Sequence, residues 1–168
     1  MPHVRLWSGF ALLVVSAAAC APKEPAPIPP PAIDSTKVRA GVDDLWRQWV
    51  DADTAGNLPA MSALVDDSIR IDSKGGPPIE GKAAYQSFAE TMLKGTDVLT
   101  EVITPDQTVV VSNELAYQNG NYVETTMSAK KKKIVEYGRY AAAIRLGADG
   151  KWRIRYIMAF SDSSVAAK

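Results

Sequence analysis

The fold of this chain follows from one stretch near its end: Tyr140-Ala-Ala-Ala-Ile-Arg-Leu146, the turn Gly147-Ala-Asp-Gly150, and Lys151-Trp-Arg-Ile-Arg-Tyr-Ile-Met-Ala-Phe160. Apolar residues recur at every second position of its second arm, which is the period of a β-strand. The residues between the arms tolerate the positive φ that a tight turn needs. We therefore predict two long antiparallel strands. In the second strand one face is predicted to be apolar and to carry Trp152, Ile154, Tyr156, Met158 and Phe160. The other face carries Arg153 and Arg155.

Composition excludes several classes of site from the body of the chain. The 168 residues include 19 basic and 19 acidic residues, so the zero formal charge gives no electrostatic case for nucleic acid as a partner. The single cysteine, Cys20, and the single histidine, His3, both lie in or beside the N-terminal apolar stretch. A Ser-His-Asp triad, a Cys-His pair and a zinc site of the usual ligand types are therefore excluded. We expect neither a metal nor a cofactor.

The first 19 residues have the three-part layout of a secretory signal peptide. Arg5 precedes an apolar run from residue 6 to residue 15, and small residues follow it. Ala17-Ala-Ala-Cys20 resembles a bacterial lipobox, although its first residue is Ala rather than Leu. We expect lipidation of Cys20, with Ala21 next to it favouring the periplasmic face of the outer membrane. The alternative is ordinary cleavage, which leaves a free thiol on a soluble periplasmic or secreted protein.

Prolines dominate residues 21–32, where so many missing backbone donors prevent helices and sheets. We expect an extended spacer that holds the following domain away from a membrane, and a ligand for a proline-recognition domain is the alternative. The predicted organisation is a signal peptide over residues 1–19, a lipidated cysteine and proline-rich linker over 20–34, and one folded domain over 35–168.

Three helices are predicted before the sheet. The first runs from a cap at Asp34 or Ser35 to about Ala55, and Asn57 caps a second, shorter helix. A third helix spans about residues 82–94. Its predicted buried side chains are Tyr85, Phe88, Met92 and Leu93.

The remaining segments alternate at period two, as strands do. Residues 68–73 place Ile69 and Ile71 on one face, opposite Arg70 and Asp72. We predict a hairpin of residues 98–104 and 108–112, and a long strand over residues 115–127 with Gly120 as a bulge. The fold class is thus α+β, with two to three helices packed on a curved, mostly antiparallel sheet of five or six strands.

Three stretches of the sequence form a recognisable set: Trp46-Arg-Gln-Trp-Val-Asp-Ala-Asp-Thr-Ala-Gly-Asn-Leu58 with Ala63-Leu-Val-Asp-Asp67, then Pro78-Ile-Glu-Gly-Lys-Ala-Ala-Tyr-Gln-Ser-Phe88, and residues 140–162. Together they resemble the nuclear-transport-factor-2-like superfamily, the cone-shaped fold of ketosteroid isomerase and the SnoaL-like polyketide cyclases. The resemblance covers residues 36–162. It implies an apolar cone closed on one side by helices, and it specifies function poorly.

The resemblance also implies where catalytic groups stand in the ketosteroid isomerases. The base position matches Asp72, whereas the helix hydroxyl matches Trp49 and the later carboxylic acid matches Ala142. A base is thus retained while both oxyanion donors are absent. Because the loss of one such donor costs about two to three orders of magnitude in rate, steroid-type isomerisation is not expected. Four strand tyrosines are candidate replacement donors: Tyr117, Tyr122, Tyr137 and Tyr140.

Two interpretations of Asp72 remain open at this point. In an apolar cone it is a candidate general acid or base with a raised pKa, whereas an ion pair with Arg70 two residues away would hold it at the rim. The tryptophans are similarly ambiguous between cavity and core, since aromatic residues at core spacing are commonly core. The predicted ligand-binding positions are Trp46, Trp49, Asp72, Tyr85, Phe88, Tyr122, Tyr140 and Ala142.

Three functional hypotheses follow. The first is a non-catalytic domain that binds an unknown small apolar or amphipathic molecule, with a lipid anchor as its link to a membrane. The second is an acid–base enzyme of the SnoaL or isomerase kind that uses Asp72. The third is a homodimer formed through the sheet face that carries Arg145 and Arg153; the alternative is that this face is a solvated exterior.

Residues 130–133 are four consecutive lysines. They suggest either an anionic partner, such as a phospholipid headgroup, or a solvated hairpin tip.

Overall fold

The computed structural model describes residues 31–73 and 75–167. The predicted signal peptide and Cys20 lie outside these residues. Residues 32–168 form one compact unit, which contains three helices and six strands. The elements in chain order are α1 (Ser35–Thr54), α2 (Leu58–Ala63), β1 (Val65–Ser73), β2 (Ile79–Glu80), α3 (Lys82–Gly95), β3 (Thr96–Ser112), β4 (Leu115–Ser128), β5 (Lys133–Leu146) and β6 (Trp152–Ala166).

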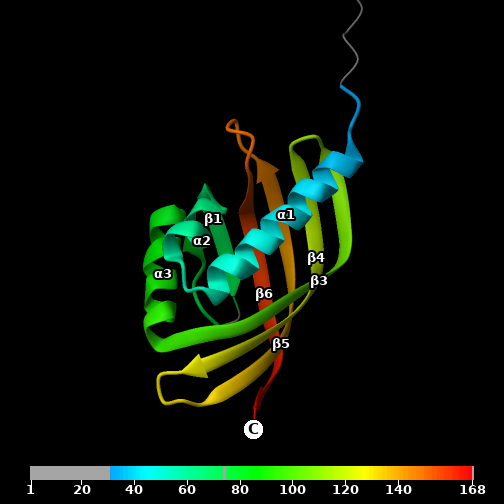
Figure 1. The fold of residues 1–168 in the computed structure, drawn as a ribbon. Helices are drawn as coiled ribbons and strands as arrows, with labels where there is room; N and C mark the ends of the chain where they lie inside the picture. The colour runs from blue at the N-terminus through cyan, green and yellow to red at the C-terminus, as the bar shows by residue number, and fades with distance from the viewer. Residues whose placement is uncertain (1–30, 74, 168) are drawn as a thin grey trace, which may run out of the picture. The chain divides into compact units, whose positions relative to one another are not determined.

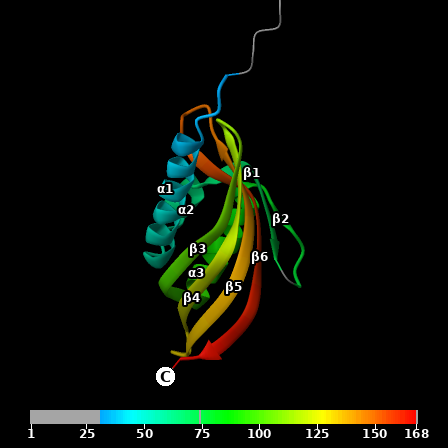
Figure 2. The ribbon, with the colours of Figure 1, turned by 90° about the vertical axis from the view of Figure 1, so that its right-hand side faces the viewer.

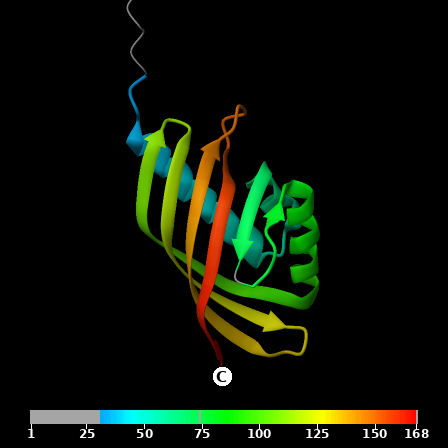
Figure 3. The same ribbon diagram turned by 180° about the vertical axis from the view of Figure 1, so that it is seen from behind.

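The six strands form one curved sheet in the order β2-β1-β6-β5-β4-β3. Neighbouring strands are antiparallel except for β1 and β6, which are parallel. Helix α1 lies obliquely across one face of the sheet (Figure 1), and α1 and α2 stand to one side of it when the view is turned by 90° (Figure 2). From behind, the strands lie in front of α1 (Figure 3). The predicted α+β class is confirmed.

Helix α1 begins and ends where its sequence places the capping residues. The Asp34 side chain accepts a hydrogen bond from the backbone N–H of Lys37 at 3.0 Å, which satisfies one free donor of the first turn. Gly56 follows the helix at a φ of 60°, the left-handed conformation that glycine adopts without strain. Between these ends an apolar stripe faces the sheet. Its buried members are Val38, Val42, Leu45 and Trp46.

The core lies between this stripe and the ends of β1, β4, β5 and β6. Ile69, Ile144 and Ile154 are at most 1% exposed there, so they anchor the helix to three strands. Gly41 allows the closest approach, because a Cβ at that position would collide with the Trp152 indole. Trp152 therefore packs against the core, as the spacing of its strand predicted.

The predicted hairpin around residues 105 and 106 is wrong. Residues 96–112 form one continuous strand, β3, whose register to β4 shifts between Pro105 and Gln107. Gly120 of β4 lies opposite Pro105, and a Cβ on it would collide with the carbonyl oxygen of Thr104. The sheet thus bends at Gly120 as predicted, but the extra residue belongs to the partner strand, where Pro105 lacks a ladder donor.

The predicted faces of β6 are correct only in its first part. The register of β5 and β6 shifts between Ala143 and Ile144, which leaves Arg155 as the extra residue of a bulge. Trp152 and Ile154 face the core before the bulge, and Ile157 and Ala159 take the inner face after it. Tyr156, predicted to share the apolar face, instead reaches Asp72 on the other side. A single extra residue reverses the alternation of everything that follows.

None of the helices in the described part of the chain combines the length and apolar character that crossing a bilayer requires.

Candidate functional site

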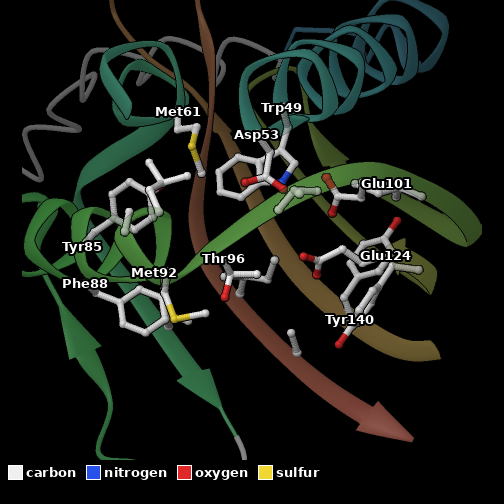
Figure 4. Close-up of a pocket in the computed structure, with 18 of the residues that line it drawn as sticks. Trp49, Asp53, Met61, Tyr85, Phe88, Met92, Thr96, Glu101, Glu124 and Tyr140 are labelled. Atoms are coloured by element: carbon white, nitrogen blue, oxygen red, sulfur yellow. The ribbon is translucent and has the colours of Figure 1, made fainter. Parts of the chain in front are cut away.

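A cavity of about 290 Å³ lies between the helices and the inner face of the sheet. Helix α3 lies on one side of the cavity and the end of α1 lies above it in Figure 4, and strands β3, β4, β5 and β6 contribute lining residues from the sheet. Aliphatic and aromatic side chains make up most of the lining. The lining residues are Trp46, Trp49, Asp53, Met61, Ile71, Tyr85, Phe88, Ala89, Met92, Leu93, Thr96, Val98, Glu101, Ile103, Tyr122, Glu124, Tyr140, Ile157 and Ala159.

Six of the eight predicted ligand-binding residues line this cavity. They come from α1, α3, β4 and β5. Four of them form a chain of ring contacts in the order Tyr140, Trp46, Trp49 and Tyr85. The ring of Trp46 stands edge-on to that of Tyr140 with centroids 5.2 Å apart, and to that of Trp49 at 6.4 Å. The six are Trp46, Trp49, Tyr85, Phe88, Tyr122 and Tyr140.

The structure places Asp72 outside the cavity lining. Its carboxylate is 3.0 Å from the Arg70 guanidinium and also accepts a hydrogen bond of 2.9 Å from the Tyr156 hydroxyl. The hydrogen bond from Arg70, more than that from Tyr156, lowers the pKa of Asp72. The ion pair weighed from the sequence is therefore present, whereas the raised pKa expected of a base in the cone is not.

Ala142 also lies outside the lining, because it is buried in the core at 3% exposure. Two other expectations need correction. Phe88 and Met92 were predicted to be buried, but they are 42% and 50% exposed. Both line the cavity while remaining partly open to solvent, so their side chains contribute to its apolar mouth.

Sequence reasoning missed three carboxyl groups that line the cavity. Asp53 projects from the last turn of α1, Glu101 from β3 and Glu124 from β4 (Figure 4). Glu101 pairs directly with Glu124 across the strands, and Glu124 pairs in turn with Glu136 of β5. We call Glu101, Glu124 and Glu136 the glutamate row.

Burial is the main influence on the lining carboxyls. It raises the pKa of Asp53 to about 6. Burial, together with the charges of Asp53 and Glu136, raises the pKa of Glu124 to about 7. Burial and the charges of Asp53 and Glu124 raise the pKa of Glu101 to about 8, although a hydrogen bond from the Trp49 indole offsets part of this rise. All three groups thus exchange protons near neutral pH.

The cavity tyrosines differ in how their hydroxyl groups are satisfied. The Tyr140 hydroxyl donates to the Gln118 side chain at 2.7 Å, and the Tyr122 hydroxyl donates to Glu136 at 2.7 Å. The Tyr85 hydroxyl is buried and has no hydrogen-bond partner among the described residues, and the same is true of Glu101 Oε2. Unpaired buried polar atoms are costly, so these two are open to a ligand.

The other two candidate tyrosines point away from the site. Tyr117 is 50% exposed and Tyr137 is 45% exposed. Each inward tyrosine instead faces a glycine across its strand pair: Tyr122 lies opposite Gly138, and Tyr140 opposite Gly120. A side chain at either glycine would collide with the facing ring or its neighbours. The glycines thereby make room for the two rings on the inner face.

These groups can hold a small apolar molecule and exchange a proton with it. The described residues include no group of three or more His, Cys, Asp or Glu side chains arranged to hold a metal ion. The polar groups that line the cavity are carboxyls, hydroxyls and indole N–H groups, set among apolar side chains.

Solved structures with this fold come from several proteins of low sequence identity. A ketosteroid isomerase-like protein from Erwinia carotovora atroseptica matches with a TM-score of 0.67 and 16% identity, over 74% of this chain and 95% of its own. Hexachlorocyclohexane dehydrochlorinase LinA-type3 from Novosphingobium barchaimii matches with a TM-score of 0.68 and 12% identity, over 79% and 91%. A putative scytalone dehydratase from Novosphingobium aromaticivorans matches with a TM-score of 0.67 and 14% identity, over 79% of this chain and 89% of its own.

At these identities the likeness shows the fold alone. Among curated proteins, none matches the chain. The family profile described as the SnoaL-like domain matches residues 46–154, which contain α1 from its middle through the start of β6. The match spans more than half of the chain and includes most residues of the cavity. This chain belongs to the SnoaL-like domain family.

Proposed function

We propose that the domain binds a small apolar or amphipathic molecule in the cavity between α1, α3 and the sheet. The observation that carries this proposal is the cavity itself, about 290 Å³ with mostly aromatic and aliphatic walls. Ligand sites in proteins are commonly concave, largely apolar and supplied with a few polar groups, and their volumes begin at about 300 Å³. A cavity at this lower limit suits a compact ligand. The names of two structural neighbours, a dehydrochlorinase and a putative scytalone dehydratase, designate enzymes of small organic molecules.

Native mass spectrometry of the domain purified from its own host tests the proposal. We expect a reproducible added mass on each protomer. Ala159→Phe should remove it, because Ala159 lines the cavity and a phenyl ring there would occupy part of the volume. The same change at Ala84, an exposed residue of α3 outside the lining, is the matched control. Bare protomers in the wild type, or an added mass unaffected by Ala159→Phe, would contradict ligand binding in this cavity.

We further propose a second candidate function, acid–base catalysis on the bound molecule. The observation in its favour is the pair Glu101 and Glu124, whose pKa values are raised mainly by burial to about 8 and about 7. General acids and bases act best when their pKa lies near the working pH. The proposed groups replace Asp72, whose pKa the hydrogen bond from Arg70 lowers.

Single-residue variants distinguish the two catalytic schemes. Once the bound molecule is known by mass, its conversion is followed with each variant. Glu124→Gln should abolish conversion while leaving the ligand bound, and Asp72→Asn should convert at the wild-type rate. The reverse result would restore the base at Asp72, and no conversion by the wild type would leave binding as the function.

The location of the domain is a separate proposal, which rests on residues 1–34 of the sequence. We propose export and attachment to the periplasmic face of the outer membrane through lipidated Cys20. The intact mass of the mature protein should then equal that of a chain beginning at Cys20 plus acyl groups. Cys20→Ser should move the protein from the membrane fraction to the soluble fraction. A mature protein with an unmodified thiol would contradict the anchor.

A further inference from the structure

We infer that the cavity takes an organic cation, a small molecule with an apolar body and a protonated amine or quaternary ammonium group. This inference rests on the proposed function, because it names the chemical class of the ligand in the same cavity. It is carried by the balance of charge in the lining, the unpaired polar atoms, and the arrangement of aromatic rings around them.

The lining holds acidic groups without any basic partner. Asp53, Glu101 and Glu124 line the cavity, and none of the described lining residues is Lys, Arg or His. Two of these acids belong to the glutamate row, in which acidic residues pair directly across three strands. Like charges opposite one another destabilise a sheet, so the row is unfavourable in the empty domain once its carboxyls are ionised. A bound cation would relieve that repulsion.

Two unpaired atoms give the cation specific partners. The Tyr85 hydroxyl belongs to a side chain only 2% exposed, lines the cavity and lacks a hydrogen-bond partner within the described part of the chain. Asp53 contributes to the raised pKa of Tyr85, after burial, so the hydroxyl lies within the field of that carboxyl. Glu101 Oε2 is equally unpaired. Both oxygens can accept a hydrogen bond from a protonated amine, whose N–H groups are donors only. A quaternary ammonium has no N–H and would be held by the carboxylate charges and the ring faces instead.

The two walls of the cavity suit the two ends of such a molecule. Phe88 and Met92 of α3 lie on one side of the cavity, whereas Glu101 and Glu124 lie on the other (Figure 4). An apolar body would contact α3 while its charged end approaches the acids. Rings stand near that end and attract cations through their faces. These rings are Trp49, Tyr122 and Tyr140.

Protons compete with the cation for these acids. Burial raises the pKa values of Asp53, Glu124 and Glu101 to about 6, 7 and 8, so all three are largely neutral at pH 5.5 and largely ionised at pH 8.5. Affinity for a permanent cation should therefore rise across this interval. The titratable groups that line the site are Asp53 of α1, Tyr85 of α3, Glu101 of β3, Tyr122 and Glu124 of β4, and Tyr140 of β5. Glu136 of β5 acts on Glu124 and Tyr122 through its charge, and Asp162 of β6 acts on Tyr122 in the same way.

Two probes that share one skeleton test the inference by calorimetry on residues 32–168, the compact unit. 2-Phenylethylammonium carries a charge throughout pH 5.5–8.5, and 2-phenylethanol carries none. We expect the ammonium to bind at least about tenfold more tightly than the alcohol at pH 8.5, and this preference to disappear by pH 5.5. Binding of the ammonium near pH 7 should also release protons, which appears as a dependence of the measured heat on the buffer.

Variants separate the acids from the apolar walls. The double change Glu101→Gln with Glu124→Gln should abolish the preference for the ammonium at pH 8.5 while the alcohol still binds. Asp72→Asn is the control, since this carboxylate lies outside the cavity and should leave the preference unchanged.

The outcomes distinguish this inference from the proposed function. Equal binding of both probes, or tighter binding of the alcohol, would overturn the cation and leave the apolar site intact. A preference that survives the double change would also overturn it. Failure of both probes to bind at millimolar concentration would contradict the cation and the ligand site together.

Discussion

The carboxyl groups inside the cavity and those outside it are held in opposite ways. Outside, Asp72 pairs with Arg70, and Asp149 accepts two hydrogen bonds from Arg153 at 2.8 and 2.6 Å. These hydrogen bonds lower the pKa of each carboxyl. Inside, Asp53, Glu101 and Glu124 have no arginine, and burial raises the pKa of each.

This difference shows that the carboxylates paired with arginine stabilise the fold, whereas the acids of the cavity do not. Asp66 shows that a buried carboxylate is compatible with this sheet when it is well paired: burial acts to raise its pKa, but hydrogen bonds from Ser68 and Arg145 outweigh burial and lower it. The same arginine pairing also occupies Arg145 and Arg153, the two residues predicted to form a dimer surface. Acids left unpaired in a cavity weaken the empty fold, which is the usual pattern of functional sites.

We call Asp66, Asp72 and Asp149, the carboxyls that pair with an arginine, the paired set. The largest effect on stability is expected from a member of this set, Asp66. Asp66→Ala removes hydrogen bonds of 3.0 Å and 2.7 Å from Ser68 and one of 2.7 Å from Arg145. Because these bonds involve a charged and buried acceptor, we expect a loss of about 2–3 kcal/mol in the free energy of unfolding at pH 7. Urea unfolding followed by tryptophan fluorescence measures it.

The adjacent residue supplies the control for that change. Asp67 is also paired, to Lys82 at 3.0 Å, but its side chain is 91% exposed. Asp67→Ala should therefore cost only a few tenths of a kcal/mol. Equal losses at the two positions would mean that burial does not set the strength of the paired acids.

Substitution of a cavity acid by a neutral residue should have the opposite effect and stabilise the folded domain. Glu101 has a folded-state pKa of about 8 against 4.5 for an ordinary glutamate, mainly through burial, so the folded state binds more protons between these pH values. The stability of the wild type should then fall as pH rises through this window. Glu101→Gln removes the charge, and we expect it to stabilise the domain by about 1–2 kcal/mol at pH 9 and hardly at all at pH 5. Thermal unfolding at both pH values measures the difference.

An exposed glutamate of the turn between β3 and β4 provides the comparison for this prediction. Glu114→Gln should leave the pH dependence of the melting temperature as it is in the wild type. A destabilised Glu101→Gln variant at pH 9 would show that the ionised carboxylate is well accommodated in the cavity, and would remove the contrast between the two sets of acids.

The paired set also contains a member with a smaller expected effect. Asp72→Asn weakens the interactions with Arg70 and Tyr156 at a site where both charged side chains are partly exposed. We expect a smaller loss of stability than for Asp66→Ala, complete above the normal pKa of aspartate and fading as pH falls toward the lowered folded-state pKa, because the carboxyl contributes nothing once it is protonated in both states. Urea unfolding at pH 7 and pH 3 tests this, and a loss of equal size at pH 3 would contradict it.

The architecture was accessible from the sequence because it depends on long periodic segments. The apolar stripe of α1, its cap at Asp34 and the strand period of residues 140–160 each specify an element independently of its neighbours. The two errors in the strands have one cause. A bulge adds a single residue whose position the local alternation does not give, so the hairpin predicted around Pro105 is one bent strand and the faces of β6 reverse after Arg155.

The site could be predicted only in part, because the sequence alone does not give the register of the strands. The aromatic residues were found because helix spacing placed Trp49 and Tyr85 on apolar helix faces, and the family resemblance also implied a cavity position for Trp49. The acids were missed because a glutamate at an inward strand position looks like one on a solvated edge until the register is known. Glu101 is two residues from Ile103, and Glu124 is two residues from Tyr122, so each glutamate shares a strand face with a residue that lines the cavity. This period-two spacing could have predicted that the two glutamates point inward.

The smallest predicted effect concerns how the most perturbed of the cavity acids is held. A hydrogen bond from the Trp49 indole lowers the pKa of Glu101, against the larger influence of burial. Trp49→Phe removes the indole N–H and should raise the pKa of Glu101 further, because a donor to the ionised form is lost. Trp46→Phe is the matched control, since the buried Trp46 Nε1 has no partner among the described residues. Carboxyl ¹³C NMR titrations of glutamate-labelled domain measure both. An unchanged Glu101 titration in Trp49→Phe, or an equal shift in both variants, would mean that burial alone holds this acid in its proton-bound form and that the indole contributes only its apolar surface.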